Sequence, residues 1–206
     1  MKRCVIVGGA DINKYDFLRE KMRADDYVIF CDSGLKHLEP LQAKPSLIVG
    51  DFDSHENPHL NVETIVLPCE KDDTDTVFAV KEALSRGFDD FLLIGVVGAR
   101  LDHTLGNVSI LLYLDSLGKN GRILDDHSEM EIVSQQPVSI PEDYAFFSLL
   151  NIDGSPRGIT ITGAKYPLAD AEISCEYQYG ISNEPLPGQT ALVTVREGRL
   201  LLIKVR

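Results

Sequence analysis

The sequence predicts an α/β domain with a mostly parallel sheet over residues 1–125, followed by an all-β domain over residues 126–206. In the first segment, short apolar runs alternate with helical patterns, which is typical of parallel strands joined by crossover helices. In the second segment, short alternating runs are separated by Gly, Pro and Asp, which favours an antiparallel sandwich or barrel. The polar segment 124–128 is short, so we expect two domains that pack together.

The elements of the first domain follow from apolar runs that end at turn residues and from helical spacing between those runs. Gly8 and Gly9, for example, form the turn that leaves the first strand. The order suits a Rossmann-like sheet. We predict strands at 4–8, 27–31, 46–50, 64–67, 91–96 and 121–125, and helices at 14–24, 34–41, 73–86 and 103–117.

The elements of the second domain are short runs in which apolar and polar residues alternate, bounded by turn residues. We predict strands at 129–134, 144–151, 158–162, 171–176, 190–195 and 199–205. Tyr177 and Tyr179 are the aromatic residues nearest to Ser182, and we interpret both as ordinary strand residues.

Composition and charge limit the possible partners. The chain has 206 residues, of which 44% are hydrophobic, enough for a sizeable core. Its formal net charge is -12, from 20 basic and 32 acidic residues. Because most of this surface repels a phosphate backbone, we expect no nucleic-acid partner.

The cysteines and the N-terminus indicate where the protein works. Four cysteines lie far apart, without the spacing of a zinc site, and Cys4 and Cys31 stand inside apolar runs where a thiol acts as a core residue. We therefore expect a reducing cytoplasm. The apolar run after Met1 is too short for a signal peptide, and no run reaches the roughly 18 residues of a membrane span, so we expect neither export nor membrane insertion.

Acidic residues recur where the predicted strands end, at Asp32, at Asp51 and Asp53, at 72–75 and at Asp102. Ligands of an open α/β sheet lie beyond the carboxyl ends of its strands, so these positions converge on one crevice. Crowded carboxylates repel one another, and a shared divalent cation is the simplest compensation.

Gly50-Asp51-Phe52-Asp53-Ser54 is the sharpest local motif. Two Asp residues at i and i+2 of an extended chain point to the same side, which suits two oxygen ligands on one hard cation. The alternative is a capped surface turn in which Asp51 and Ser54 bond local backbone amides.

The run 70–75 precedes a helical pattern. Asp72 and Asp75 would share a helical face if the helix begins early enough, with Lys71 beside them to meet a phosphate. The alternative is that Asp72 or Asp73 caps the helix.

The run 98–104 lies at a strand-to-helix turn. Helix-start amides and Arg100 make a seat for phosphate, and Asp102 could hold metal or orient a substrate hydroxyl. The alternative is a helix cap plus a surface arginine, and for His103 we favour a structural role. The chain lacks a GxxxxGK[ST] loop, so bound ATP would rely on metal and on Arg or Lys contacts.

Together these motifs resemble those of the thiamin pyrophosphokinase family, in the family's order. The resembling segments are 32–34 (Asp-Ser-Gly), 45–54 (PSLIVGDFDS), 71–75, 100–103 (RLDH), 158–168 (GITITGAKYPL) and 180–184 (GISNE). They are distributed along the chain, so the resemblance extends over nearly its whole length.

The resemblance implies a homodimer in which an α/β catalytic domain and a β-sandwich thiamin domain build each active site between subunits. It implies that ATP and thiamin give AMP and thiamin diphosphate, with Mg²⁺ as cofactor. The implied catalytic set is Asp51, Asp53, Asp75, Arg100 and Asp102, of which Asp51, Asp53 and Asp75 are the metal set. The implied ATP and phosphate contacts are Asp32, Lys71, Asp72, Thr74, Arg100, Asp102 and His103, and the implied thiamin contacts are Ser182 and Asn183.

Two other functions are consistent with the residues. In a phosphohydrolase, Asp51 would be the nucleophile and Asp53 the acid, and inorganic phosphate would be released without a second substrate. A nucleotide- or thiamin-sensing module would bind without turnover, although the intact run of carboxylates with Lys71 and Arg100 argues against it.

Overall fold

The computed structural model describes residues 2–52, 59–70 and 72–206. Contacts between residues divide the chain into two compact units, Met1–Asp126 and His127–Arg206, and each unit is described by itself. The division falls one residue after the predicted one. Among the described residues, the structure has no helix of the length and apolarity needed to cross a bilayer.

The first unit is built on a parallel sheet with the strand order β4-β3-β2-β1-β5-β6. The chain adds strands on one side of β1 and then continues on its other side at β5, so the point between β1 and β5 is a topological switch point, where ligands bind in such sheets. The strands are β1 (Arg3–Val7), β2 (Tyr27–Cys31), β3 (Leu47–Gly50), β4 (Thr64–Val66), β5 (Asp90–Ile94) and β6 (Asn120–Leu124).

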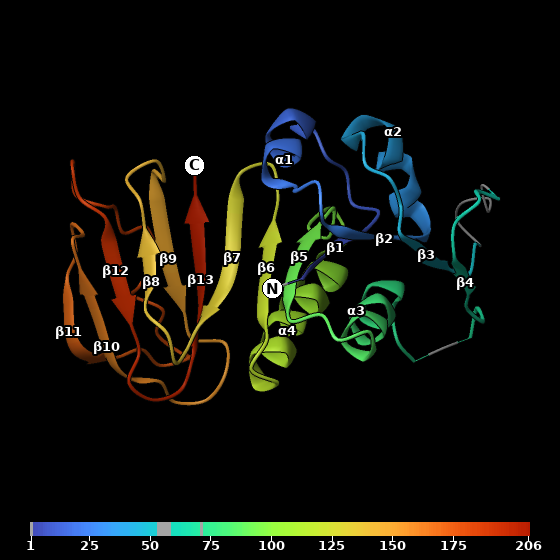
Figure 1. Cartoon of the computed structure of the whole chain (residues 1–206). Coiled ribbons are helices and arrows are strands. Elements are labelled where there is room, and N and C mark those ends of the chain that lie inside the picture. The colour runs from blue at the N-terminus through green and yellow to red at the C-terminus, as the bar shows by residue number, and fades with distance from the viewer. Residues whose placement is uncertain (1, 53–58, 71) are drawn as a thin grey trace. The chain divides into compact units, whose positions relative to one another are not determined.

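Helices cover both faces of this sheet (Figure 1). Leu18, Leu35 and Leu41 pack with alternate residues of β1 and β2 on one face, while α3 contacts β1, β2 and β3. The helical elements are α1 (Tyr15–Lys21), the 3-10 helix η1 (Asp32–His37), α2 (Leu38–Leu41), α3 (Asp75–Ser85) and α4 (Leu101–Ser116). The α/β prediction is confirmed, as are the buried positions of Cys4 and Cys31.

The second unit is all-β, as predicted, with two antiparallel arrangements. One has the order β7-β13-β9 and the other the order β11-β10-β12-β8. Inward residues of both, such as Phe147, Ile161 and Leu202, form one core cluster. The strands are β7 (Ser128–Val133), β8 (Val138–Ile140), β9 (Phe146–Leu150), β10 (Arg157–Thr162), β11 (Leu168–Glu172), β12 (Ala191–Thr194) and β13 (Leu200–Val205).

Two strand predictions in this unit were wrong. The short strand β8 lies between Pro137 and Pro141, a segment for which the sequence predicted no strand. The strand expected at 171–176 is β11, which ends at Glu172. Tyr177 and Tyr179 therefore lie in the loop after β11 rather than in a strand, with ring centroids 5.7 Å apart.

Candidate active site

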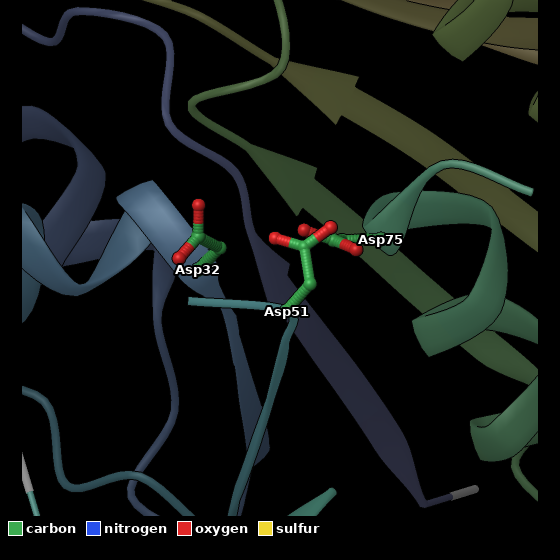
Figure 2. Close-up of side chains that lie close together, drawn as sticks. All are labelled: Asp32, Asp51 and Asp75. Carbon is green, nitrogen blue, oxygen red and sulfur yellow. The ribbon is translucent and has the colours of Figure 1, made fainter. Parts of the chain in front are cut away.

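Three aspartates from separate segments meet beyond the carboxyl ends of β2 and β3. Asp32 follows β2 and Asp51 follows β3, while Asp75 is the first residue of α3. Each offers a carboxylate oxygen, and these oxygens all lie within 4.8 Å of one another. Figure 2 shows the three side chains, which lie close together.

The backbone around the cluster is arranged for close approach. Asp32 has a φ of 24°, a conformation that Asp tolerates better than most residues. A Cβ at Gly50 would lie 2.9 Å from the Asp32 Cβ, so glycine is required there. Phe52 has a φ of 56°, which is uncommon for a residue other than glycine, and its ring packs against the core.

The donor set fits a hard divalent cation. All three groups are carboxylates, and Oδ1 of Asp32 and Oδ1 of Asp75 are buried atoms. The separation limit of 4.8 Å is close to twice the roughly 2.1 Å magnesium–oxygen distance, so small side-chain movements would bring the oxygens onto one ion. The crowding of negative charge supplies the attraction.

A cleft of about 380 Å³ opens at the switch point between β1 and β5. Ser33 and Thr76, the neighbours of Asp32 and Asp75, belong to its wall, so the cleft adjoins the carboxylate cluster. A Cβ at Gly8 would stand 2.6 Å from the Gly95 carbonyl oxygen, so only glycine allows these two turns to touch. The wall comprises Gly8, Gly9, Ala10, Asp11, Ser33, Thr76, Gly95, Val96, Gly98, Ala99, Arg100, His103, Thr104 and Asn107.

The turn into α4 places the positively charged side chain of Arg100 in the wall of this cleft. Arg100 Nε donates to Asp102 Oδ1 at 3.0 Å and its NH2 to Oδ2 at 2.6 Å, and both side chains are exposed. The guanidinium holds the pKa of Asp102 well below its ordinary value, so Asp102 is ionised at neutral pH. The Thr104 hydroxyl accepts from the Gly98 amide at 3.1 Å and steadies the turn. His103 also lines the cleft.

The start of α3 differs from what the sequence suggested. Thr74 is the N-cap, and its hydroxyl accepts from the Val77 amide at 3.3 Å. The alternative in which Asp72 or Asp73 caps the helix is therefore wrong. Asp72 is exposed and precedes the helix, so it does not share a helical face with Asp75, and Asp73 pairs with Lys81 at 2.6 Å. The hydroxyl of Thr74 is engaged in the cap.

Two of the expected site residues, Asp53 and Lys71, lie outside the described residues. Asp53 belongs to the metal and catalytic sets and Lys71 to the phosphate contacts, and both assignments stay predictions.

The expected thiamin residues lie in the second unit and differ in their surroundings. Asn183 is buried, and its Oδ1 accepts from the amides of Tyr166 and Glu184 at 3.0 and 2.9 Å. Its Nδ2 donates to the Tyr166 carbonyl at 2.8 Å. Ser182 is exposed at a φ of 58°, and its amide donates to Ser148 Oγ. The geometry of Asn183 therefore favours positioning of the 166 and 184 backbone.

The sequence reasoning missed several residues of the cleft wall. Asn107 is 7% exposed, and its Nδ2 donates to the Val96 carbonyl at 2.8 Å. It stands four residues after His103, on the same helix face, and this spacing was the available signal. Ser33 and Thr76 could have been found as the neighbours of Asp32 and Asp75.

A glycine-lined cleft at the switch point, with carboxylates gathered beside it, defines this protein as a ligand-binding α/β protein of the open-sheet class joined to an all-β unit. The family model described as "Thiamin pyrophosphokinase, catalytic domain" matches residues 18–123, and the model "Thiamin pyrophosphokinase, vitamin B1 binding domain" matches residues 134–200. The chain belongs to the thiamin pyrophosphokinase family.

Individual relatives agree with this membership. A thiamine pyrophosphokinase of Bacillus subtilis is 28% identical over 212 residues, which cover 99% of this chain and 99% of the relative. A crystal structure of the thiamine pyrophosphokinase from Bacillus subtilis has a TM-score of 0.86 at 26% identity and covers 99% of each chain. That of Geobacillus thermodenitrificans has a TM-score of 0.84 at 26% identity and covers 99% of this chain and 97% of that one.

Proposed function

We propose that this chain transfers the pyrophosphoryl group of ATP to the hydroxyl of thiamin, giving thiamin diphosphate and AMP. The observation that carries the proposal is the gathering of Asp32, Asp51 and Asp75 beside the glycine-lined cleft. Carboxylates suit a metal-bound polyphosphate, and backbone amides at the turns after β1 and β5 suit phosphate oxygens. Family membership supplies the substrates.

The residues have separate tasks in this reaction. The thiamin hydroxyl oxygen forms a bond to the β-phosphorus of ATP while the bond from that phosphorus to the α–β bridging oxygen breaks, and AMP leaves. An aspartate of the cluster accepts the hydroxyl proton. Arg100, at the edge of the cleft, neutralises charge that grows on the phosphates. The cleft holds the nucleotide in line with the incoming oxygen.

Magnesium is the cofactor that we propose for the cluster. Asp51 and Asp75 would hold it, with Asp32 in reach and Asp53 as the further ligand that the family resemblance implies. When bound, the ion would supply positive charge to the β- and γ-phosphate oxygens.

The second unit, by its family match, would hold thiamin. Ser182 and Asn183 would stand at that site, Ser182 as a contact and Asn183 through the backbone that its amide holds. The proposal includes the finer descriptions of the two units, a Rossmann-like catalytic domain over 1–125 and a β-sandwich thiamin domain over 126–206. A cytoplasmic location stays a prediction, which the buried free thiols of Cys4 and Cys31 support.

A phosphohydrolase with Asp51 as nucleophile is the main rival. The approach of Asp32 and Asp75 to the Asp51 carboxylate favours shared ligation of a cation over nucleophilic attack by Asp51. A sensing module would bind nucleotide or thiamin without turnover.

The products distinguish these functions. The protein is incubated with ATP, Mg²⁺ and thiamin, and the products are separated by chromatography, with parallel reactions that lack thiamin or contain EDTA. We expect AMP and thiamin diphosphate in equal amounts, and neither without thiamin or with EDTA. ADP or inorganic phosphate as the main product would favour the hydrolase, and unchanged ATP would favour the sensing module.

We also propose that two copies form a homodimer through α4. Leu101 and Leu105 on this helix are 66% and 60% exposed, and Tyr113 is exposed as well. Leu101, Leu105, Val108 and Leu112 recur at helical spacing and form an apolar stripe along α4. A second copy is the occupant that family resemblance suggests for such a stripe.

Leu105→Glu is expected to convert the dimer to monomer in sedimentation-velocity experiments at micromolar concentration. A twofold interface contains this leucine twice, and burial of each side chain contributes about 1.5–3 kcal/mol. The dissociation constant of the dimer should therefore rise by roughly a hundredfold or more. Gln136→Glu adds the same charge at an exposed loop residue and should leave the dimer intact. A dimeric Leu105→Glu protein would place the interface elsewhere.

A further inference from the structure

A buried histidine lies behind the cleft, and none of the proposed steps uses it. His37, the last residue of η1, is 1% exposed. Its Nε2 lies 2.8 Å from the Ala10 carbonyl oxygen, and its Nδ1 lies 2.8 Å from the Tyr15 hydroxyl. Both ring nitrogens of this buried histidine therefore have a hydrogen-bond partner.

The partners of the ring determine its protonation. The Ala10 carbonyl can only accept, so Nε2 carries the hydrogen and donates it. Nδ1 of the neutral ring then accepts from the Tyr15 hydroxyl. Burial lowers the pKa of His37, against the opposing effects of the Ala10 hydrogen bond and of Asp11, while Lys36 lowers it further. The ring is therefore neutral near pH 7.

The Ala10 peptide is part of the cleft wall, and His37 fixes it from behind. The Ala10 amide donates to the Gly95 carbonyl at 2.8 Å, so this residue is held between β5 and η1. Lys36, next to His37, donates to Asp11 at 2.7 Å and ties the following residue of the same turn. The element that carries His37 begins at Asp32 of the carboxylate cluster.

We propose that His37 is a positioning residue, whose Nε2–H···O=C bond to Ala10 holds the turn after β1 in the conformation that receives the nucleotide phosphates. The inference rests on the proposed function for the identity of the nucleotide. The bond from His37 to Ala10 would act on ground-state binding, so loss of this bond should weaken ATP binding more than it slows turnover. Tyr15 keeps the ring in the correct tautomer and orientation.

Two substitutions of His37 test its two hydrogen bonds separately. His37→Gln can place an N–H donor near the Nε2 position and keep the bond to Ala10. His37→Asn can place an acceptor near the Nδ1 position and keep the bond to Tyr15, but it loses the donor to Ala10. We expect His37→Asn to raise the KM for ATP and the Kd of ATP without thiamin by about tenfold, the upper range for one hydrogen bond. We expect His37→Gln to stay within about threefold of the wild type.

A merely structural role gives another result. Both variants would then lower the melting temperature and the active fraction, and the KM for ATP of the folded molecules would equal that of the wild type. That outcome would overturn the proposal, as would equal KM values for the Gln and Asn variants. The active fraction is counted by titration with nucleotide, so misfolded molecules do not enter the comparison.

A measurement on the wild-type protein decides the matter even if substitutions prevent folding. A ¹H–¹⁵N spectrum of ¹⁵N-histidine-labelled protein should show His37 as the Nε2–H tautomer at pH 7, and ATP added without thiamin should shift this resonance. An Nδ1–H tautomer, or a resonance that does not respond to ATP, would contradict the proposal.

The two proposals can fail separately. If the wild type makes no thiamin diphosphate, the proposed function fails, whereas the Kd of ATP still tests His37. If the wild type is active and His37→Asn binds ATP normally, only the inference about His37 fails.

Discussion

Replacement of Asp75 by Asn is expected to lower the rate of thiamin diphosphate formation by about a hundredfold or more, the usual result of removing a charged group that stabilises a transition state. Asn keeps the shape and one oxygen of the side chain but removes the charge. In the structure, this charge lies within 4.8 Å of the oxygens of Asp32 and Asp51 and next to the cleft. The change should also raise the Mg²⁺ concentration needed for half-maximal activity, because one anionic ligand is lost.

The fold should survive this substitution. Asp75 is the first residue of α3, but the helix cap is Thr74, so the cap hydrogen bond to Val77 remains. Relief of repulsion within the cluster opposes the loss of a favourable charge at the helix start, so the melting temperature without Mg²⁺ should change by only a few degrees. Rates measured across a Mg²⁺ titration and melting curves provide the comparison.

Asp73→Asn is the matched control. Asp73 lies two residues from Asp75 and pairs with Lys81 at the surface, outside the cluster. Loss of an exposed ion pair has a small effect on stability, so the fold should be unchanged. Because the substitution also leaves the carboxylate cluster intact, we expect a rate of thiamin diphosphate formation within about twofold of the wild type. Equal rates for Asp75→Asn and wild type, with Mg²⁺ dependence unchanged, would remove Asp75 from the reaction.

The convergence of the carboxylates could be predicted because it follows from topology. Parallel strands all present their carboxyl ends at one edge, and Asp32 and Asp51 each come directly after an apolar strand. No knowledge of side-chain contacts was needed. The sequence also indicated that residues near Asp75 begin a helix, which brings that carboxylate to the same edge.

The local assignments around α3 could not be decided in the same way. Asp72, Asp73 and Thr74 are all good N-cap residues, and they stand next to one another. Which of them caps depends on where tertiary packing of Ala79, Val80 and Ala83 sets the helix register. The sequence pattern therefore predicts that a helix forms here, but it does not determine which of a few neighbouring residues begins it.

The second unit was harder for a related reason. The strand β8 has three residues between two prolines, and β11 has a polar sequence, Leu-Ala-Asp-Ala-Glu, with Asp170 at a φ of 51°. The alternation of β8, Val-Ser-Ile, is too short to be a signal, β11 shows no clear alternation, and both strands depend on pairing with their neighbours. Asn183 illustrates the same limit at the site, since a motif does not reveal whether an amide faces a ligand or, as here, the backbone at Tyr166.

Replacement of Arg100 is expected to have the second large effect. Arg100→Gln should lower kcat/KM for ATP by about a hundredfold. The substitution removes the arginine that lies in the described cleft wall, so the negative charge that develops on the phosphates is no longer neutralised by it. Arg100→Lys should restore only part of the activity, since a point charge lacks the planar fork that binds two oxygens at once. Neither change should alter the melting temperature much, because the Arg100–Asp102 pair is exposed. Arg196→Gln, which breaks an exposed pair with Asp170 in the other unit, is the control and should leave kcat/KM unchanged.

The double variant Arg100→Gln/Asp102→Asn then separates two roles for Asp102. If Asp102 acts only by orienting Arg100, its loss costs nothing further once Arg100 is absent, and the double variant matches Arg100→Gln. If Asp102 meets the substrate or a metal itself, the two losses multiply in kcat/KM. We expect the first result, because both oxygens of Asp102 are engaged by the guanidinium in the structure. A double variant at least tenfold slower than Arg100→Gln would instead give Asp102 a direct part in the reaction.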